Sequence, residues 1–149
     1  MRQFPELENV LRNLFSTQRL AVLATQGLRQ PHTSLVAFAA TEDLKYLLFV
    51  TSRSTLKYQN ITTAPRVAML IDSRPNRGSD FSRSIAVTAI GTAEEAIGDE
   101  LAYLRGVYIT KHRNMEDFLG AADNALLKID IEQYMISNFK DVLTLKLSD

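Results

Sequence analysis

Short apolar segments of strand-like composition follow one another along most of this chain, with only brief polar turns between them. The first three are 19–25, 31–40 and 45–51. The turns that separate them, 26–30 and 41–43, are too short to hold the crossover helix that parallel neighbours require. The spacing therefore predicts an antiparallel meander.

Further segments of the same kind continue the pattern at 66–72, 85–96, 127–132, 134–139 and 142–147. Segment 127–132 alternates apolar and charged residues, which is typical of a strand with one buried face. Gly91 lies inside another of these segments and predicts a bulge or a close backbone approach. Consecutive strands with short connections favour a barrel or a sandwich, so we expect six or seven mostly antiparallel strands in a mainly β protein.

Helices flank this β-rich pattern. The first carries an apolar stripe with helical spacing, made of Leu7, Val10, Leu11, Leu14 and Phe15. Shorter helices are expected within 52–64 and around 115–119. A chain of 149 residues fits one domain. We expect that domain to span 1–149, with an N-terminal helix at 5–17, a barrel core at about 19–96, a helix at about 98–113 and C-terminal strands at about 126–147.

Charge and composition exclude several classes of function. The 17 basic and 17 acidic residues balance, whereas a nucleic-acid binder usually carries a basic field. The absence of cysteine excludes disulfides and thiol catalysis. The two histidines are far apart in the sequence, so we interpret His32 as a strand residue and His112 as a cation at a helix end, with no metal site. No run approaches the ~18 apolar residues of a membrane helix, and the N-terminal residues lack an apolar leader, so we expect a cytoplasmic protein.

Segment 51–57 is the strongest candidate for chemistry. It places four hydroxyl groups and two cations, Arg53 and Lys57, at a strand-to-helix junction. Backbone N–H groups and hydroxyls at a helix start bind phosphate well, and a cation adds charge. A capped helix with solvated cations explains the same residues. The loop 73–84, which holds three arginines, is interpreted as a solvated hairpin loop.

Three ordered pieces of sequence resemble the pyridoxamine 5′-phosphate oxidase-like FMN-binding split-barrel superfamily. The main piece is 48–61, Leu-Phe-Val-Thr-Ser-Arg-Ser-Thr-Leu-Lys-Tyr-Gln-Asn-Ile, followed by Ala-Pro-Arg-Val-Ala at 64–68. The others are 20–34, with Leu-Ala-Val-Leu-Ala-Thr and Pro-His-Thr-Ser, and 89–94, Ala-Ile-Gly-Thr-Ala-Glu. The resemblance implies a six-stranded antiparallel split β-barrel and a homodimer with FMN in grooves at the subunit interface.

The same resemblance implies roles for individual residues. It places Thr55 and Lys57 at the FMN phosphate, with Arg53 or Ser54 as helpers. Val50 and Thr51 would line the flavin. The neighbouring strand would add contacts from His32, Thr33, Ser34 and Leu35.

Two departures separate this chain from the oxidase itself. Leu56 stands where the oxidase carries an arginine beside its lysine, and the sequence given lacks the C-terminal Arg-x-His motif that grips the oxidase substrate. We therefore expect an FMN-dependent oxidoreductase that acts on an unknown small molecule. Its only acid–base candidates are His32, Tyr58 and Arg53.

Other readings remain open. The protein is alternatively a non-catalytic flavin store or sensor, a haem binder with His112 as axial ligand, or a dimeric structural module with a vestigial pocket. A deazaflavin in place of FMN also fits, because related split barrels accept it.

Overall fold

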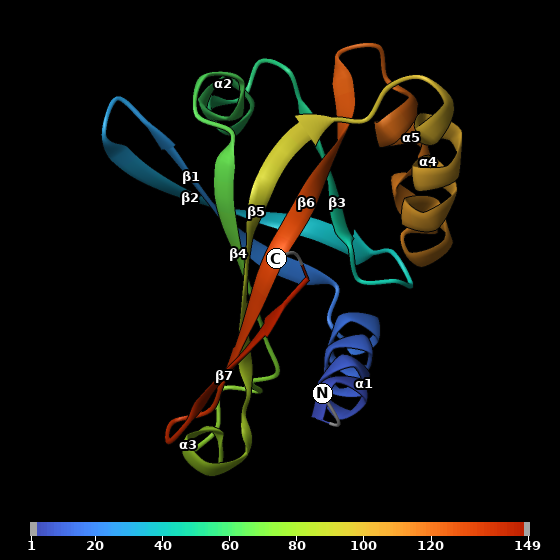
Figure 1. Ribbon diagram of the computed structural model, residues 1–149. Helices are drawn as coiled ribbons and strands as arrows, with labels where there is room; N and C mark the ends of the chain where they lie inside the picture. The colour runs from blue at the N-terminus through green and yellow to red at the C-terminus, as the bar shows by residue number, and fades with distance from the viewer. Residues whose placement is uncertain (1–2, 148–149) are drawn as a thin grey trace.

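Seven antiparallel strands form the body of the protein in a computed structural model that describes residues 3–147 (Figure 1). The strands are β1 Leu20–Gly27, β2 Gln30–Ala40, β3 Tyr46–Ser52, β4 Arg66–Asp72, β5 Ala86–Glu95, β6 Asn124–Ser137 and β7 Val142–Lys146. Their order in the sheet is β3-β2-β1-β4-β5-β6-β7, and β3 also pairs with β6. Six strands thus close into a barrel and β7 adds an edge strand to β6, which confirms the predicted six-stranded antiparallel barrel.

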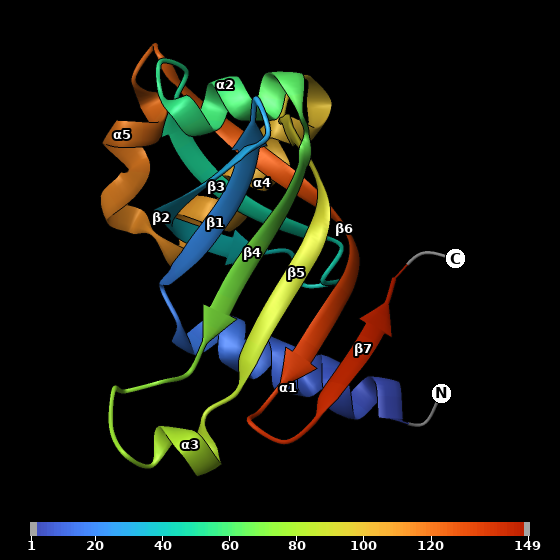
Figure 2. The same cartoon turned by 90° about the vertical axis from the view of Figure 1, so that its left-hand side faces the viewer.

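Helices close and flank this barrel. They are α1 Gln3–Thr17, α2 Leu56–Thr63, α3 Asp80–Arg83, α4 Asp99–Lys111, a 3-10 turn at Arg113–Met115 and α5 Glu116–Gly120. Figure 2 shows α1 crossing the lower end of the barrel and α2 lying at the upper end. The helix expected at 5–17 corresponds to α1, which begins two residues earlier, and Pro5 falls in its first turn, where no backbone N–H bond is lost. No helix within residues 3–147 combines the length and the apolar character needed to cross a bilayer.

The barrel is split because β2 and β3 pair along only part of their length. Their register runs from Ala40↔Leu47 to Phe38↔Phe49 and goes no further. Beyond it, β2 as far as Gln30 pairs with β1 alone, and β3 as far as Ser52 pairs with β6 alone. The two strands therefore diverge toward the end of the barrel that α2 covers.

Strand alternation builds the main core. Leu23, Phe38, Phe49 and Met69 point inward and are fully buried. Phe15 of α1 meets Phe38 edge to face, with ring centroids 5.7 Å apart, and so fixes α1 to the barrel. Each such buried side chain contributes about 1.5–3 kcal/mol to folding through removal of its apolar surface from water.

A second, smaller core forms on the outside of β3, where α4 and α5 cover the strand (Figure 1). Leu48 and Val50 of β3 pack there against Leu104 and Tyr108 of α4 and Leu119 of α5. Because β3 is buried on both faces, its sequence is a continuous apolar run instead of an alternating one.

The structure corrects the expected C-terminal strands. Segments 127–132 and 134–139 were expected to be separate, but they belong to one strand, β6. Gly91 of β5 pairs with Ile131 and Ile90 pairs with Gln133, so Glu132 is an extra, bulged residue. The bulge shifts the apolar alternation by one position, which in the sequence is indistinguishable from a break between strands.

The first hairpin turn also differs from its expected form. A turn over 26–30 around Gly27 was expected, but Gly27 pairs with Gln30 and the turn consists of Leu28 and Arg29, with φ of 52° and 67°. Gly27 instead allows the side chain of Asn60 to approach the strand closely, because a Cβ at this position would overlap the side-chain oxygen of Asn60. Asn60 of α2 in turn donates to Thr25 Oγ1 at 3.1 Å.

His112 is not the solvated helix-end cation that its position suggested. It is only 5% exposed, and its Nε2 lies 2.6 Å from the carbonyl oxygen of Phe38. Burial lowers the pKa of His112, Lys111 and Arg19 lower it further, and the Phe38 carbonyl opposes them. The ring of Tyr108 packs beside the imidazole of His112, with the two ring centroids 5.0 Å apart.

We therefore expect His112 to make stability fall at mildly acid pH. A histidine with a lowered pKa in the folded protein binds fewer protons there than when unfolded, so its contribution is present above pH ~6.5 and is lost as pH falls below that value. Urea unfolding at pH 7.5 and 5.5 should show a larger loss for the wild type than for His112→Gln, whose amide can still donate to Phe38. Equal losses would contradict this account.

Candidate flavin-binding site

The predicted site residues lie on the two strands that diverge at the split. Segment 32–35 belongs to β2, beyond its last pair with β3, and segment 50–57 runs from β3 into the first turn of α2. The fold therefore brings both predicted segments to the same end of the barrel, each on one side of the split.

The hydroxyl groups at the start of α2 cap the helix. Thr55 is the N-cap, and its Oγ1 accepts from the Tyr58 N–H at 3.3 Å. The same oxygen donates to the Ser52 carbonyl at 2.9 Å and accepts from Thr51 Oγ1 at 2.8 Å. Both threonine hydroxyls are thus engaged within the chain, as the simple helix-cap interpretation expected.

Two backbone N–H groups remain open at this helix start. Within residues 3–147, neither Leu56 nor Lys57 has a hydrogen-bond partner for its N–H, because these are the first two residues of α2. The Lys57 ammonium forms no ion pair with any described residue. Free N–H groups, the positive end of the helix dipole and a cation together form an anion site.

Arg53 is held by a carboxylate that was not among the predicted site residues. Its Nε and Nη2 donate to the two oxygens of Glu95 at 3.3 and 2.6 Å, and its Nη1 donates to the Ala122 carbonyl at 3.1 Å. The Tyr58 hydroxyl also donates to Glu95, at 2.8 Å. The bond from Arg53 holds the pKa of Glu95 below its usual range, and the bond to Glu95 raises the pKa of Tyr58.

A second carboxylate, Asp123, orders the serines of this turn. Ser52 Oγ donates to Asp123 Oδ2 at 2.7 Å and lies 2.8 Å from Ser54 Oγ, which therefore donates to it. The Asp123 carbonyl also accepts from the Arg53 N–H at 2.9 Å. Asp123 thus fixes the loop that precedes α2, and the Ser54 hydroxyl is already a donor within the chain.

On β2, one polar group lacks a partner. Ser34 Oγ is buried and has no hydrogen-bond partner among the described residues. A buried hydroxyl without a partner is costly, and a ligand that offers a hydrogen bond would satisfy it. Its neighbours Thr33 and Leu35 are exposed, and His32 is half-buried.

Val50 and Thr51 are less accessible than a flavin wall requires. Val50 is 8% exposed and lies in the core beneath α4 and α5, while Thr51 is buried against Thr55. Both residues predicted to line the flavin are thus largely buried within the single chain.

These residues fit the terminal phosphate and one polar edge of FMN. Two unpaired N–H groups and Lys57 match a phosphate, and the unpartnered Ser34 hydroxyl matches a hydrogen-bonding ring edge. When bound, FMN would supply hydride or electron transfer.

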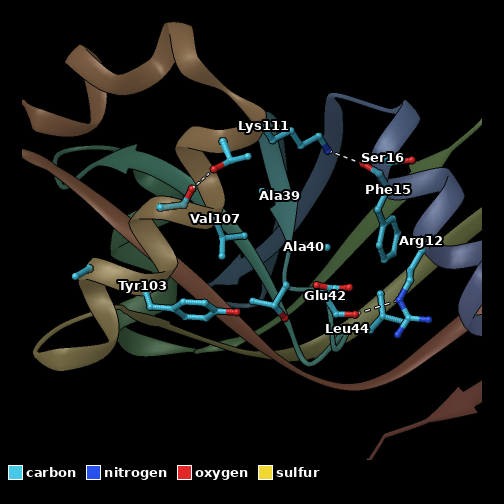
Figure 3. A pocket seen from close by; sticks show the side chains of 14 residues that line it. Arg12, Phe15, Ser16, Ala39, Ala40, Glu42, Leu44, Tyr103, Val107 and Lys111 are labelled. Carbon is cyan, nitrogen blue, oxygen red and sulfur yellow. Dashed lines mark hydrogen bonds between the residues drawn. The ribbon is translucent and has the colours of Figure 1, made fainter.

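A voluminous hollow lies elsewhere. A groove of about 870 Å³ opens between α1, α4 and the β2–β3 hairpin, as Figure 3 shows. Its apolar lining includes Phe15, Leu44 and Val107, and Lys111 spans one side by donating to the Phe15 and Gln18 carbonyls, both at 2.7 Å. No predicted site residue lines this groove.

The comparisons with known proteins agree with this architecture. Residues 7–136 match the family model of pyridoxamine 5′-phosphate oxidase. The chain belongs to that family, as an oxidase-related protein with the split-barrel fold. No curated protein sequence matches it.

Solved structures share the fold at low sequence identity. A heme binding protein from Mycobacterium smegmatis superimposes with a TM-score of 0.82 and 18% identity, over 93% of this chain and 57% of that one. General Stress Protein 26 from Bacillus anthracis str. Sterne superimposes with a TM-score of 0.72 and 20% identity, over 95% of this chain and 99% of that one. A FAD-binding protein from Mesorhizobium loti superimposes with a TM-score of 0.69 and 19% identity, over 86% of this chain and 90% of that one. The chain thus spans little more than half the length of the Mycobacterium protein, and these likenesses concern the fold.

Proposed function

We propose that this protein binds FMN at the split of the barrel, with the phosphate at the start of α2, and acts as an oxidoreductase on a small molecule. The observation that carries the proposal is the set of open donors at this point: the N–H groups of Leu56 and Lys57 and the Lys57 ammonium. Family membership and the FAD-binding relative support a flavin as the ligand.

In this proposal, the chain's own residues bind and orient the ligand. Lys57 and the α2 N–H groups hold the phosphate, and Ser34 donates to or accepts from the ring edge. Tyr58 and Arg53 are committed to Glu95. Of the three acid–base candidates, His32 alone is therefore left to exchange a proton with a substrate.

The protein is proposed to act as a homodimer. The outward residues of β1, β2 and β4 form an apolar face, on which Leu20 is 52%, Leu35 65% and Leu70 38% exposed. Contiguous apolar surface of this kind marks an interaction site. A second copy packed on it would cover Leu35, which is one of the predicted flavin residues of β2, and would close the site from the other side.

We expect Leu70→Asp to convert a dimer into a monomer and to abolish FMN binding. Leu70 lies on the outward face of β4, away from the split, so the new carboxylate is buried only if a partner covers it. Light scattering gives the mass and fluorescence quenching gives the FMN affinity. A Leu70→Asp dimer, or a monomer that binds FMN as well as the wild type, would refute the shared site.

Turnover with a nicotinamide donor separates an enzyme from a flavin store. We expect the purified protein to bind FMN and to oxidise the donor faster than free FMN does. The haem reading is less well supported, because His112 Nε2 is already engaged with Phe38. A haem titration in which the Soret band disappears in His112→Ala would favour haem over flavin.

A further inference from the structure

The candidate anion site at the start of α2 has two cations and two carboxylates, so its charges balance. Its cations are Lys57 and Arg53, and its carboxylates are Glu95, which binds Arg53, and Asp123, which binds Ser52. A site built only for tight phosphate binding would gain from surplus positive charge, because phosphate carries up to two negative charges. The presence of two carboxylates at this site therefore requires an explanation.

Glu95 engages side chains of the kind that bind phosphate in other sites. Both of its oxygens lie on the Arg53 fork, which is the planar pair of donors that arginine uses for phosphate, and Oε1 also accepts from Tyr58. Asp123 differs, because its carboxylate accepts from the Ser52 hydroxyl and its backbone carbonyl accepts from the Arg53 N–H. Glu95 thus occupies the guanidinium of Arg53, whereas Asp123 orders the loop.

We propose that Glu95 withholds Arg53 from the ligand phosphate, so that Lys57 is the one side-chain cation that grips it and the flavin remains exchangeable. This inference rests on the proposed function. It assigns Arg53, which was expected to help bind the phosphate, to Glu95 instead, and it makes Glu95 the residue that sets the affinity of the site.

A double-mutant cycle tests the proposal through binding, with no need for activity. FMN affinity is measured by fluorescence quenching for the wild type, Glu95→Gln, Arg53→Gln and the double variant. We expect Glu95→Gln to bind FMN about tenfold more tightly and to release it more slowly, because the freed guanidinium adds a charge-assisted contact. Arg53→Gln should change wild-type affinity by less than about twofold, and it should cancel the gain in the Glu95→Gln background.

Two controls make the result specific. Glu94→Gln removes the same charge one residue away, where the carboxylate pairs with Lys128, and should leave FMN affinity within about twofold. Riboflavin, which lacks the phosphate, should bind wild type and Glu95→Gln equally. A gain for riboflavin as large as that for FMN would overturn the proposal.

The remaining outcomes separate this inference from the proposed function. If the wild type binds FMN and Glu95→Gln binds it no more tightly, Glu95 has only a structural role. The inference then fails, while the proposed function stands. If Arg53→Gln by itself weakens FMN binding about tenfold, Arg53 already contacts the phosphate and the inference fails, whether or not the Glu95 variant folds. If none of the four proteins binds FMN, the proposed function and the inference fail together.

Discussion

A Lys57→Ala variant is expected to bind FMN at least about tenfold more weakly than the wild type, with little change in stability. Lys57 supplies a charge-assisted contact worth about 1.5–3 kcal/mol, and it forms no ion pair with the described residues whose loss would disturb the fold. The N–H groups of Leu56 and Lys57 remain in the variant, so some binding should persist.

Lys146→Ala is the matched control, because it removes an exposed lysine from the edge strand β7. Its FMN affinity should equal that of the wild type. Riboflavin should bind Lys57→Ala as well as it binds the wild type, since the lost contact is to phosphate. Unchanged FMN affinity in Lys57→Ala would place the phosphate elsewhere, and the arginine-bearing loop 73–84 would be the next segment to mutate.

Gly91→Ala has the largest expected effect on folding. A Cβ at Gly91 would overlap the backbone carbonyl of Asp130 and press on Ile129. Backbone in a strand pair cannot move aside as a flexible side chain does, and this pair of β5 with β6 helps to close the barrel. We expect a loss of about 3 kcal/mol or more in the free energy of unfolding, which is a large share of the 5–15 kcal/mol of a typical domain.

Gly106→Ala provides the contrast. Gly106 lies inside α4, and a Cβ there would meet nothing within 4 Å. Alanine favours the helix by about 0.5–1 kcal/mol over glycine, so this variant should be slightly more stable than the wild type. Urea unfolding measures both variants. Gly91→Ala with wild-type stability would show that the close approach of β5 and β6 is not a requirement of the fold.

The sequence predicts the order and the kind of most elements, because period-two alternation and short turns are local signals. The strand at 66–72 has the bounds expected for it. The bulge at Glu132 was hidden, because a change of phase in alternation resembles the end of a strand. The left-handed conformation of Leu28 and Arg29 was hidden for another reason, since neither residue type favours positive φ.

The site was predicted in part. Segment 51–57 was singled out by its hydroxyl groups and cations, whereas Val50 and segment 32–35 were added through resemblance, and the fold brings all of them to the split. Glu95 and Asp123 were missed because their contacts to Arg53 and Ser52 span 42 and 71 positions, so that no local pattern connects them. The one sequence signal for Glu95 was its place beside Glu94 at the end of a strand. The burial of Val50 was equally hidden, since it depends on α4 folding back over β3.

A crystal structure of the protein grown with excess FMN tests the central claim most directly. The account predicts the phosphate within hydrogen-bond distance of the Leu56 and Lys57 N–H groups and the Lys57 ammonium, the flavin ring at the split near Ser34, and a second copy of the chain packed on the face that bears Leu35. A structure in which FMN lies in another part of the molecule, or in which the start of α2 holds only solvent despite saturating FMN, would contradict it.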